Sequence, residues 1–280
     1  MVRENKRKRL LLCIALIAVC MAGCGAVEAD AETEEIVEPV EAEISFEGLS
    51  LSILGDSIST FEGYIPEGYA VFYPVVGDVT DVSQTWWMKL LDDTGMELCS
   101  NDSSAGSTCV GYSMSVDDPK YGCGGYRISA LAGEQGKIPD VIIIYMGTND
   151  LLTAVPLGDN DGTKWVSEGE IENFSDAYCL ILDKIASNFP ISRIYCCTLP
   201  LVGEFDSKQG AVTFTNRIGL SSEDYSERIR VIAQNKGIRV LDLYPCGVGL
   251  DNMAEMTTDG VHFTPAGMEY IEHAMLNSMK

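Results

Sequence analysis

Short apolar runs recur along the chain from residue 49 onward and are separated by longer polar stretches. They occupy residues 49–54, 96–99, 141–146, 193–199 and 238–243. The third run, Val-Ile-Ile-Ile-Tyr-Met, is continuous and rich in β-branched residues, which is typical of a strand buried on both faces of a sheet. The other four runs predict further short strands.

Helical spacing of apolar residues fills the intervals between these runs. In residues 171–188 apolar side chains recur every three or four positions, and the stretch ends before Pro190. Similar patterns predict helices over 83–93, 126–132 and 221–236. Thr264, a favoured N-cap residue, and Pro265, favoured at the first helical position, open a final helix that reaches about residue 279.

The alternation of strands and helices predicts an α/β domain whose parallel sheet is covered by helices on both faces. In such sheets ligands bind beyond the carboxyl ends of the strands. Functional residues are therefore expected directly after the apolar runs.

The first 24 residues have the pattern of an export signal. Basic residues up to Arg9 precede an apolar run from Leu10 to Ala22, and about thirteen apolar residues are too few for a membrane-spanning helix, which takes roughly 20. The run ends in Met-Ala-Gly-Cys, which resembles the bacterial lipobox. This resemblance implies lipid attachment at Cys24 and an extracytoplasmic protein anchored to the bacterial cell membrane. An ordinary signal peptide cut near the same place is the alternative.

Residues 25–47 contain nine acidic residues and no basic one, which predicts a flexible tether ahead of a folded domain over 48–280. The formal net charge is −23. Residues 1–24 hold five basic residues and one acidic residue, so their removal changes this charge to −27. A surface this acidic is a poor match for nucleic acid or for polyanionic substrates. Neutral sugars, neutral esters and cations stay compatible.

Polar residues with catalytic potential follow the apolar runs. Ser57, in a Gly-Asp-Ser turn, follows the first run, and Gly106, which leaves its backbone N–H accessible, follows the second. Asn149, whose amide can donate to an oxyanion, follows the third run in Gly-Thr-Asn-Asp. Asp259 and His262 stand three residues apart, just before the last predicted helix.

The segments around Ser57, Gly106, Asn149 and His262, in this order and at these strand ends, resemble the SGNH/GDSL hydrolases. The resemblance covers essentially the whole predicted domain from residue 49 to the end. The family letters fall on Ser57, Gly106, Asn149 and His262. The resemblance implies that Ser57 is the nucleophile, that His262 is its base and that Asp259 orients His262. It implies an oxyanion hole made by the Ser57 N–H, the Gly106 N–H and the Asn149 amide. It also implies a flavodoxin-like, three-layer α/β/α sandwich whose five parallel strands have the order 2-1-3-4-5.

The scarcity of histidine points the same way without the family. A serine nucleophile needs a base, and histidine is the side chain best suited to that role near neutral pH. The chain has only two histidines. His273 lies within the last predicted helix and is expected to be structural or exposed. His262 is therefore the candidate base, and a structural loop histidine is the alternative.

The remaining candidate groups are expected to be structural. Asp56 and Asp150 are predicted to accept hydrogen bonds from loop N–H groups, and the Asp-Asn-Asp-Gly stretch at 159–162 predicts a turn and not a calcium loop. The seven cysteines beyond Cys24 form no C-x-x-C pair, so we expect no metal and no cofactor. Cys109 and Cys123 flank a glycine-rich loop and could pair.

Long segments between the elements, 61–82, 112–125, 151–169 and 201–219, are predicted to line the cleft and contain many aromatic residues. Aromatic faces stack on sugar rings, and an exported protein meets polysaccharide outside the cell. We therefore expect a serine esterase that removes small O-acyl groups, above all acetyl groups, from carbohydrates. The alternatives are a lipase or lysophospholipase, an acyltransferase, and a non-catalytic glycan-binding surface lipoprotein.

Overall fold

The computed structural model describes residues 45–111, 121–167, 169 and 171–279. The predicted export signal, Cys24 and most of the predicted tether lie outside the described residues. Phe46, within the predicted tether, is 7% exposed and packs into the hydrophobic core, so the packed body includes this residue. Within the described ranges, no helix combines the length and apolar character needed to cross a bilayer.

The central sheet has five parallel strands in the order β2-β1-β3-β4-β7. The strands are β1 Ser50–Gly55, β2 Glu97–Ser103, β3 Val141–Tyr145, β4 Arg193–Cys197 and β7 Arg239–Leu241. The fifth sheet strand is numbered β7 because β5 Gly203–Asp206 and β6 Gly210–Thr213 form a separate antiparallel hairpin. The predicted strand order is therefore confirmed.

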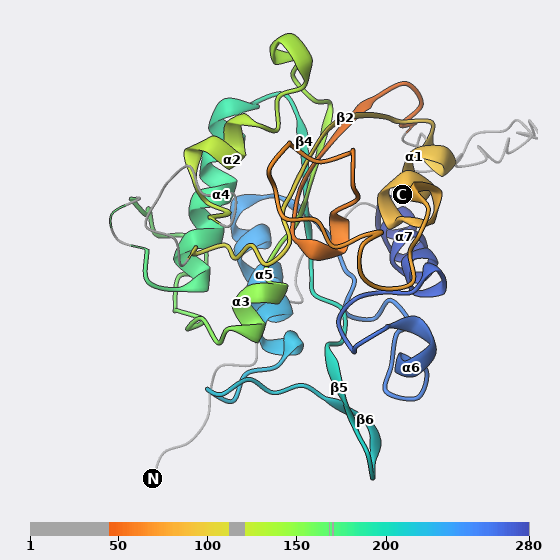
Figure 1. Ribbon diagram of the computed structural model, residues 1–280. Helices are drawn as coiled ribbons and strands as arrows, with labels where there is room; N and C mark the ends of the chain where they lie inside the picture. Colours follow the sequence, from red (N-terminus) through yellow and green to blue (C-terminus); the bar gives the residue numbers. More distant parts are fainter. Residues whose placement is uncertain (1–44, 112–120, 168, 170, 280) are drawn as a thin grey trace, which may run out of the picture. The chain divides into compact units, whose positions relative to one another are not determined.

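Helices cover both faces of the sheet, which confirms the three-layer α/β/α architecture (Figure 1). One face carries α1 Trp86–Thr94 and α7 Pro265–Met279, and the other carries α2 Gly125–Ser129, α4 Phe174–Asn188 and α5 Ser222–Lys236. Alternate β3 side chains pack against the two helical layers. Ile142 and Ile144 face the α4 side, whereas Ile143 and Tyr145 face the α1–α7 side. This double burial explains why the β3 sequence is continuously apolar.

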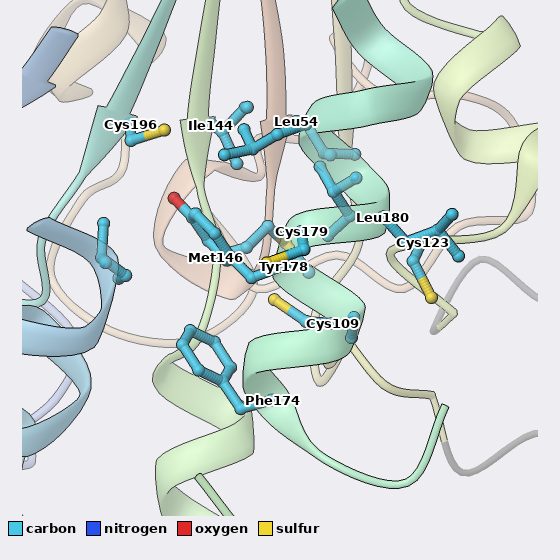
Figure 2. Close-up of a cluster of buried hydrophobic side chains, with 14 of the residues drawn as sticks. Leu54, Cys109, Cys123, Ile144, Met146, Phe174, Tyr178, Cys179, Leu180 and Cys196 are labelled. Atoms are coloured by element: carbon cyan, nitrogen blue, oxygen red, sulfur yellow. The ribbon is translucent and has the colours of Figure 1, made fainter. Parts of the chain in front are cut away.

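The core on the α4 side is rich in sulfur. Figure 2 shows side chains of β1, β3, β4 and α4 packed together with Cys109, Cys123, Cys179 and Cys196. All seven cysteines of the described chain are free thiols, including Cys109 and Cys123. Burial raises the pKa of the Cys196 thiol to about 12, so this residue packs as a small apolar side chain.

Some elements differ from the sequence-based expectation. The second apolar run ends at Cys99, but β2 continues to Ser103 because its last three polar residues are buried and hydrogen-bonded. Two short helices, α3 Thr148–Leu152 and α6 Met253–Met256, and the β5–β6 hairpin were not predicted from the sequence. These elements are too short for apolar periodicity to reveal them.

Candidate active site

Ser57 lies in a tight turn directly after β1. Asp56 caps the 3-10 helix Ser57–Ser59 by accepting a backbone hydrogen bond of 3.0 Å through Oδ1. Gly55 is needed before this turn, because a Cβ there would lie 2.5 Å from the Ser103 Oγ. The turn places Ser57 at the carboxyl end of the strand, where it is only 4% exposed.

Side chains below the turn hold it in place. The Ser59 carbonyl accepts hydrogen bonds from the Trp87 indole at 3.1 Å and from the Asn101 amide at 2.9 Å. The Trp86 indole donates to the Ser59 hydroxyl at 3.2 Å. Both tryptophans are fully buried, and they also support the Ser57 turn through their N–H groups.

His262 connects Ser57 to Asp259. The His262 Nε2 lies 2.9 Å from the Ser57 Oγ, and its Nδ1 lies 2.8 Å from the Asp259 Oδ2. The other Asp259 oxygen accepts the His262 backbone N–H at 2.8 Å, which fixes the carboxylate relative to the ring. With the proton on Nδ1, the imidazole donates to Asp259 and accepts from the Ser57 hydroxyl, the arrangement that a general base requires.

The Asp259 carboxylate is poised to stay ionised. Partial burial alone would raise its pKa, but hydrogen bonds from the His262 ring and backbone outweigh burial and lower the pKa to about 2. A negative charge on Asp259 therefore faces Nδ1 at every pH near neutrality. A negative charge in this position can stabilise a protonated imidazole ring.

Three candidate oxyanion donors follow three neighbouring strands, β1, β3 and β2. The Asn149 Nδ2, in the first turn of α3, is buried and has no hydrogen-bond partner in the described part of the chain. The backbone N–H groups of Ser57 and Gly106 likewise make no hydrogen bond to another described residue. Gly106 has φ +77°, and a Cβ there would meet open space. Unpaired donors of this kind are available to a ligand oxygen.

Asp150 links two of these donor segments. Its carboxylate accepts the Cys109 N–H at 2.8 Å and the Val110 N–H at 3.3 Å, and so ties the loop after β2 to the start of α3. Gly106 lies in that loop and Asn149 precedes Asp150. The prediction that Asp150 holds loop N–H groups is confirmed, and so is the same prediction for Asp56.

Burial perturbs both of these carboxyls. Full burial raises the pKa of Asp150 to about 7, against the opposing effect of its hydrogen bonds from Cys109 and Val110. Burial likewise raises the pKa of Asp56 to about 6, opposed by the hydrogen bond from the Ile58 N–H and by the electrostatic interaction with His262. Each carboxyl is a scaffold group whose charge state changes close to neutral pH.

A buried ion pair beneath the Ser57 turn was not predicted from the sequence. The Arg127 guanidinium pairs with Asp102, and its Nη2 donates to the Gly55 carbonyl at 3.0 Å and to the Asp102 carbonyl at 2.5 Å. Both side chains are fully buried. The only available signal was a charged residue inside the short apolar pattern of 126–132.

The predicted cleft aromatics occupy different environments. Phe72 stacks on the His262 ring, with centroids 3.6 Å apart and planes at 9°. Tyr73 is fully buried, whereas Trp165 is 79% exposed. Tyr112 lies outside the described residues. Phe72 is thus part of the site and does not merely line its approach.

Other sequence candidates lie apart from the Ser57–His262 relay. His273 is 59% exposed on α7, with its Nε2 3.6 Å from Glu272. The stretch 159–162 forms the predicted turn, in which Asn160 accepts the Gly162 N–H at 3.0 Å. Across the described ranges, no group of three or more His, Cys, Asp or Glu side chains is arranged to hold a metal ion.

Comparison with known proteins identifies the family of the chain. Residues 49–200 match the family model of the GDSL-like lipases and acylhydrolases. A GDSL-like lipase-type protein from Bacteroides ovatus is similar in structure, with 28% identity, a TM-score of 0.60, and coverage of 83% of this chain and 98% of that chain. A similar protein from Bacteroides uniformis has 26% identity and a TM-score of 0.59, with coverage of 82% of this chain and 95% of that chain.

A more distant structure is the acetyl xylan esterase AlAXEase. It is 17% identical, with a TM-score of 0.51 and coverage of 82% of this chain and 99% of that chain. This likeness concerns the fold alone. No protein of curated function matches the sequence significantly.

Proposed function

The chain belongs to the GDSL-like lipase/acylhydrolase family of ester-bond hydrolases, and from this premise we propose that Ser57, His262 and Asp259 form the catalytic relay of a serine esterase. The observation that carries the proposal is the continuous relay, with 2.9 Å from Ser57 to His262 and 2.8 Å from His262 to Asp259. The reaction is acyl transfer from an ester to water through an acyl-enzyme.

In the first half of the reaction, the Ser57 Oγ attacks the ester carbonyl carbon while the His262 Nε2 takes the hydroxyl proton. The carbonyl oxygen becomes an oxyanion, which receives hydrogen bonds from the Ser57 N–H, the Gly106 N–H and the Asn149 Nδ2. The imidazolium then gives its proton to the leaving alcohol oxygen as the carbon–oxygen bond breaks. The acyl group stays on Ser57.

In the second half, a water molecule replaces the alcohol. The water oxygen attacks the acyl carbon while His262 takes a proton from the water. The same three oxyanion donors stabilise the second oxyanion. Collapse of this intermediate releases the carboxylic acid, and His262 returns the proton to the Ser57 Oγ. Asp259 stays ionised throughout and stabilises the imidazolium in both halves.

Labelling with a fluorophosphonate probe tests the relay. The wild-type protein should react covalently at Ser57, because the probe phosphorus takes the place of the ester carbonyl. Ser57→Ala should abolish the labelling, and His262→Ala should slow it strongly. A folded wild-type protein that does not react, or a Ser57→Ala variant that reacts at the wild-type rate, contradicts the assignment.

For the substrate we propose small O-acyl esters, above all acetyl esters, on neutral carbohydrates. Ser57 is only 4% exposed and the His262 side chain 14%, so the reacting atoms lie below the surface, where a short acyl group fits more easily than a long one. The strongly acidic chain repels polyanionic substrates and tolerates neutral glycans. Exposed aromatics such as Trp165 suit contact with sugar rings.

A substrate panel tests this specificity. Acetate release from acetylated xylan and from short aryl acetates is the expected result. A chain-length series that favours long acyl groups would indicate a lipase or lysophospholipase, and transfer of the acyl group to an added sugar acceptor would indicate an acyltransferase. Absence of both hydrolysis and transfer in folded protein would indicate a non-catalytic glycan-binding protein.

We also propose that the protein is exported and anchored through a lipid on Cys24. The support is the basic and apolar N-terminal pattern and the Met-Ala-Gly-Cys tetrapeptide. Radiolabelled palmitate should be incorporated into the wild-type protein in bacteria and lost in Cys24→Ser. Equal labelling of both proteins, or recovery of wild-type protein in the cytosol, contradicts this proposal.

A further inference from the structure

One face of the His262 ring is covered by an aromatic side chain from a distant part of the sequence. The Phe72 ring lies parallel to the imidazole, with a centroid separation of 3.6 Å and an angle of 9° between the planes. Hydrogen bonds at Nδ1 and Nε2 hold two edges of the imidazole, but two points do not define a plane. The stacked Phe72 ring supplies the third constraint, because it blocks tilting about the line between the two nitrogens.

The Phe72 ring is itself held on several sides. Tyr73 packs edge-on against it, with centroids 4.9 Å apart and planes at 80°. Gly77 has φ +83°, and a Cβ there would lie 3.2 Å from the Phe72 ring. The Tyr73 hydroxyl donates to the Phe263 carbonyl at 3.0 Å, so the neighbour of Phe72 is bonded to the neighbour of His262.

The backbone of Phe72 is also connected to the nucleophile. Its N–H donates to the Thr60 Oγ1 at 3.0 Å, and the Thr60 hydroxyl donates to the Ser57 carbonyl at 2.9 Å. Ala70, two residues earlier, accepts the Ala105 N–H at 2.8 Å, next to the Gly106 segment. The stretch 60–73 therefore contacts the nucleophile turn, the Gly106 loop and the His262 loop.

We propose that Phe72 is a positioning residue that fixes the plane of the His262 ring during catalysis. The inference rests on the proposed roles of Ser57 and His262 and extends them. When the Ser57 Oγ bonds to the substrate carbon, it no longer holds Nε2 as in the resting state. Asp259 and Phe72 then keep the imidazolium aimed at the leaving oxygen, and the electron-rich face of Phe72 also attracts that cation.

Steady-state kinetics of Phe72→Leu on a short alkyl acetate test this role. We expect kcat to fall roughly tenfold while KM changes by less than about twofold, because misplacing a catalytic group costs rate and not binding. Phe72→Tyr, which keeps the stacking ring, should retain a kcat within about twofold of the wild type. If Phe72→Leu does not fold, Phe72→Met provides the same test with a side chain that adapts to the space.

Phe61→Leu is the matched control. Phe61 belongs to the same stretch and packs against Tyr64, with ring centroids 6.1 Å apart, but it does not stack on His262. Its replacement should lower the melting temperature without lowering kcat. The role of Phe72 is refuted if Phe72→Leu leaves kcat unchanged, if KM carries the whole effect, or if Phe61→Leu lowers kcat equally.

Ser57→Ala separates failure of this inference from failure of the proposed function. Loss of hydrolysis in Ser57→Ala together with an unchanged kcat in Phe72→Leu overturns only the role of Phe72. Hydrolysis that survives Ser57→Ala overturns the proposed nucleophile and, with it, the inference that depends on it.

Discussion

Replacing Asp150 with asparagine should weaken the pH dependence of stability. Asp150 is fully buried, and burial raises its pKa from the ordinary 3.8 to about 7. Between pH 3.8 and about pH 7, therefore, this carboxyl is protonated in the folded state but ionised in the unfolded state. The stabilisation that comes from this proton is complete below about pH 4 and is lost as the pH rises through 7. Asp150→Asn removes the titrating group and keeps an acceptor oxygen for one of the two N–H groups, the shorter-bonded one of Cys109.

The magnitude follows from the two pKa values. Each pH unit between the folded and unfolded pKa corresponds to about 1.4 kcal/mol, so complete titration of Asp150 costs about 4 kcal/mol. Between pH 5 and pH 8 the free energy of unfolding falls by about 2–3 kcal/mol because of Asp150. The fall occurs mainly below pH 7, where the folded state still holds the proton that the unfolded state has released. Asp56, with a pKa of about 6, adds a loss of about 1–2 kcal/mol over the same range in both proteins.

Urea unfolding at pH 5 and pH 8 measures this effect. The decrease in the free energy of unfolding from pH 5 to pH 8 should be about 2–3 kcal/mol smaller in Asp150→Asn than in the wild type. Titration of all other groups is common to the two proteins, so the difference isolates Asp150. Equal decreases in the two proteins would refute the argument that burial of Asp150 controls its protonation.

Three further predictions concern the proposed catalytic groups. Asp259→Asn should lower kcat by roughly 10²–10⁴ at pH 8, because an amide cannot stabilise the His262 imidazolium as a carboxylate does; a loss below about tenfold contradicts this role. Asn149→Ala should lower kcat by roughly 10²–10³ without lowering the melting temperature, since the Nδ2 has no partner in the described chain, and a stability loss with unchanged kcat argues against an oxyanion donor. Gly106→Ala should destabilise the fold by about 1–2 kcal/mol in thermal unfolding because φ is +77°, and an unchanged melting temperature would contradict that backbone requirement.

The fold follows largely from local pattern. The β3 sequence is apolar at every position because both faces are buried, and its predicted and observed ends differ by one residue. The β2 strand was predicted four residues too short at its carboxyl end, because polar side chains from Asn101 to Ser103 look like a loop when their partners are unknown. Those partners, Arg127 and Ser59, are brought in by tertiary packing.

The candidate site, too, was predictable from the sequence only in part. Ser57, Gly106, Asn149 and His262 could be named from the residues that follow the apolar runs, and the scarcity of histidine singled out His262. The β5–β6 hairpin could not be foreseen, although it packs directly beside the His262 loop through the bond from the Gly203 N–H to the Gly260 carbonyl.

The sequence by itself determined the five strands of the central sheet, the main helices and the chemical identity of the candidate catalytic groups, because these depend on periodicity and residue type within short stretches of chain. Only the tertiary structure decided that the Ser57 Oγ and the His262 Nε2 lie 2.9 Å apart and that Phe72 covers the imidazole. These contacts join residues far apart in the chain. They depend on strand order, on loop conformation and on the packing of residues 60–73 against two other loops, and none of these is encoded by any single stretch.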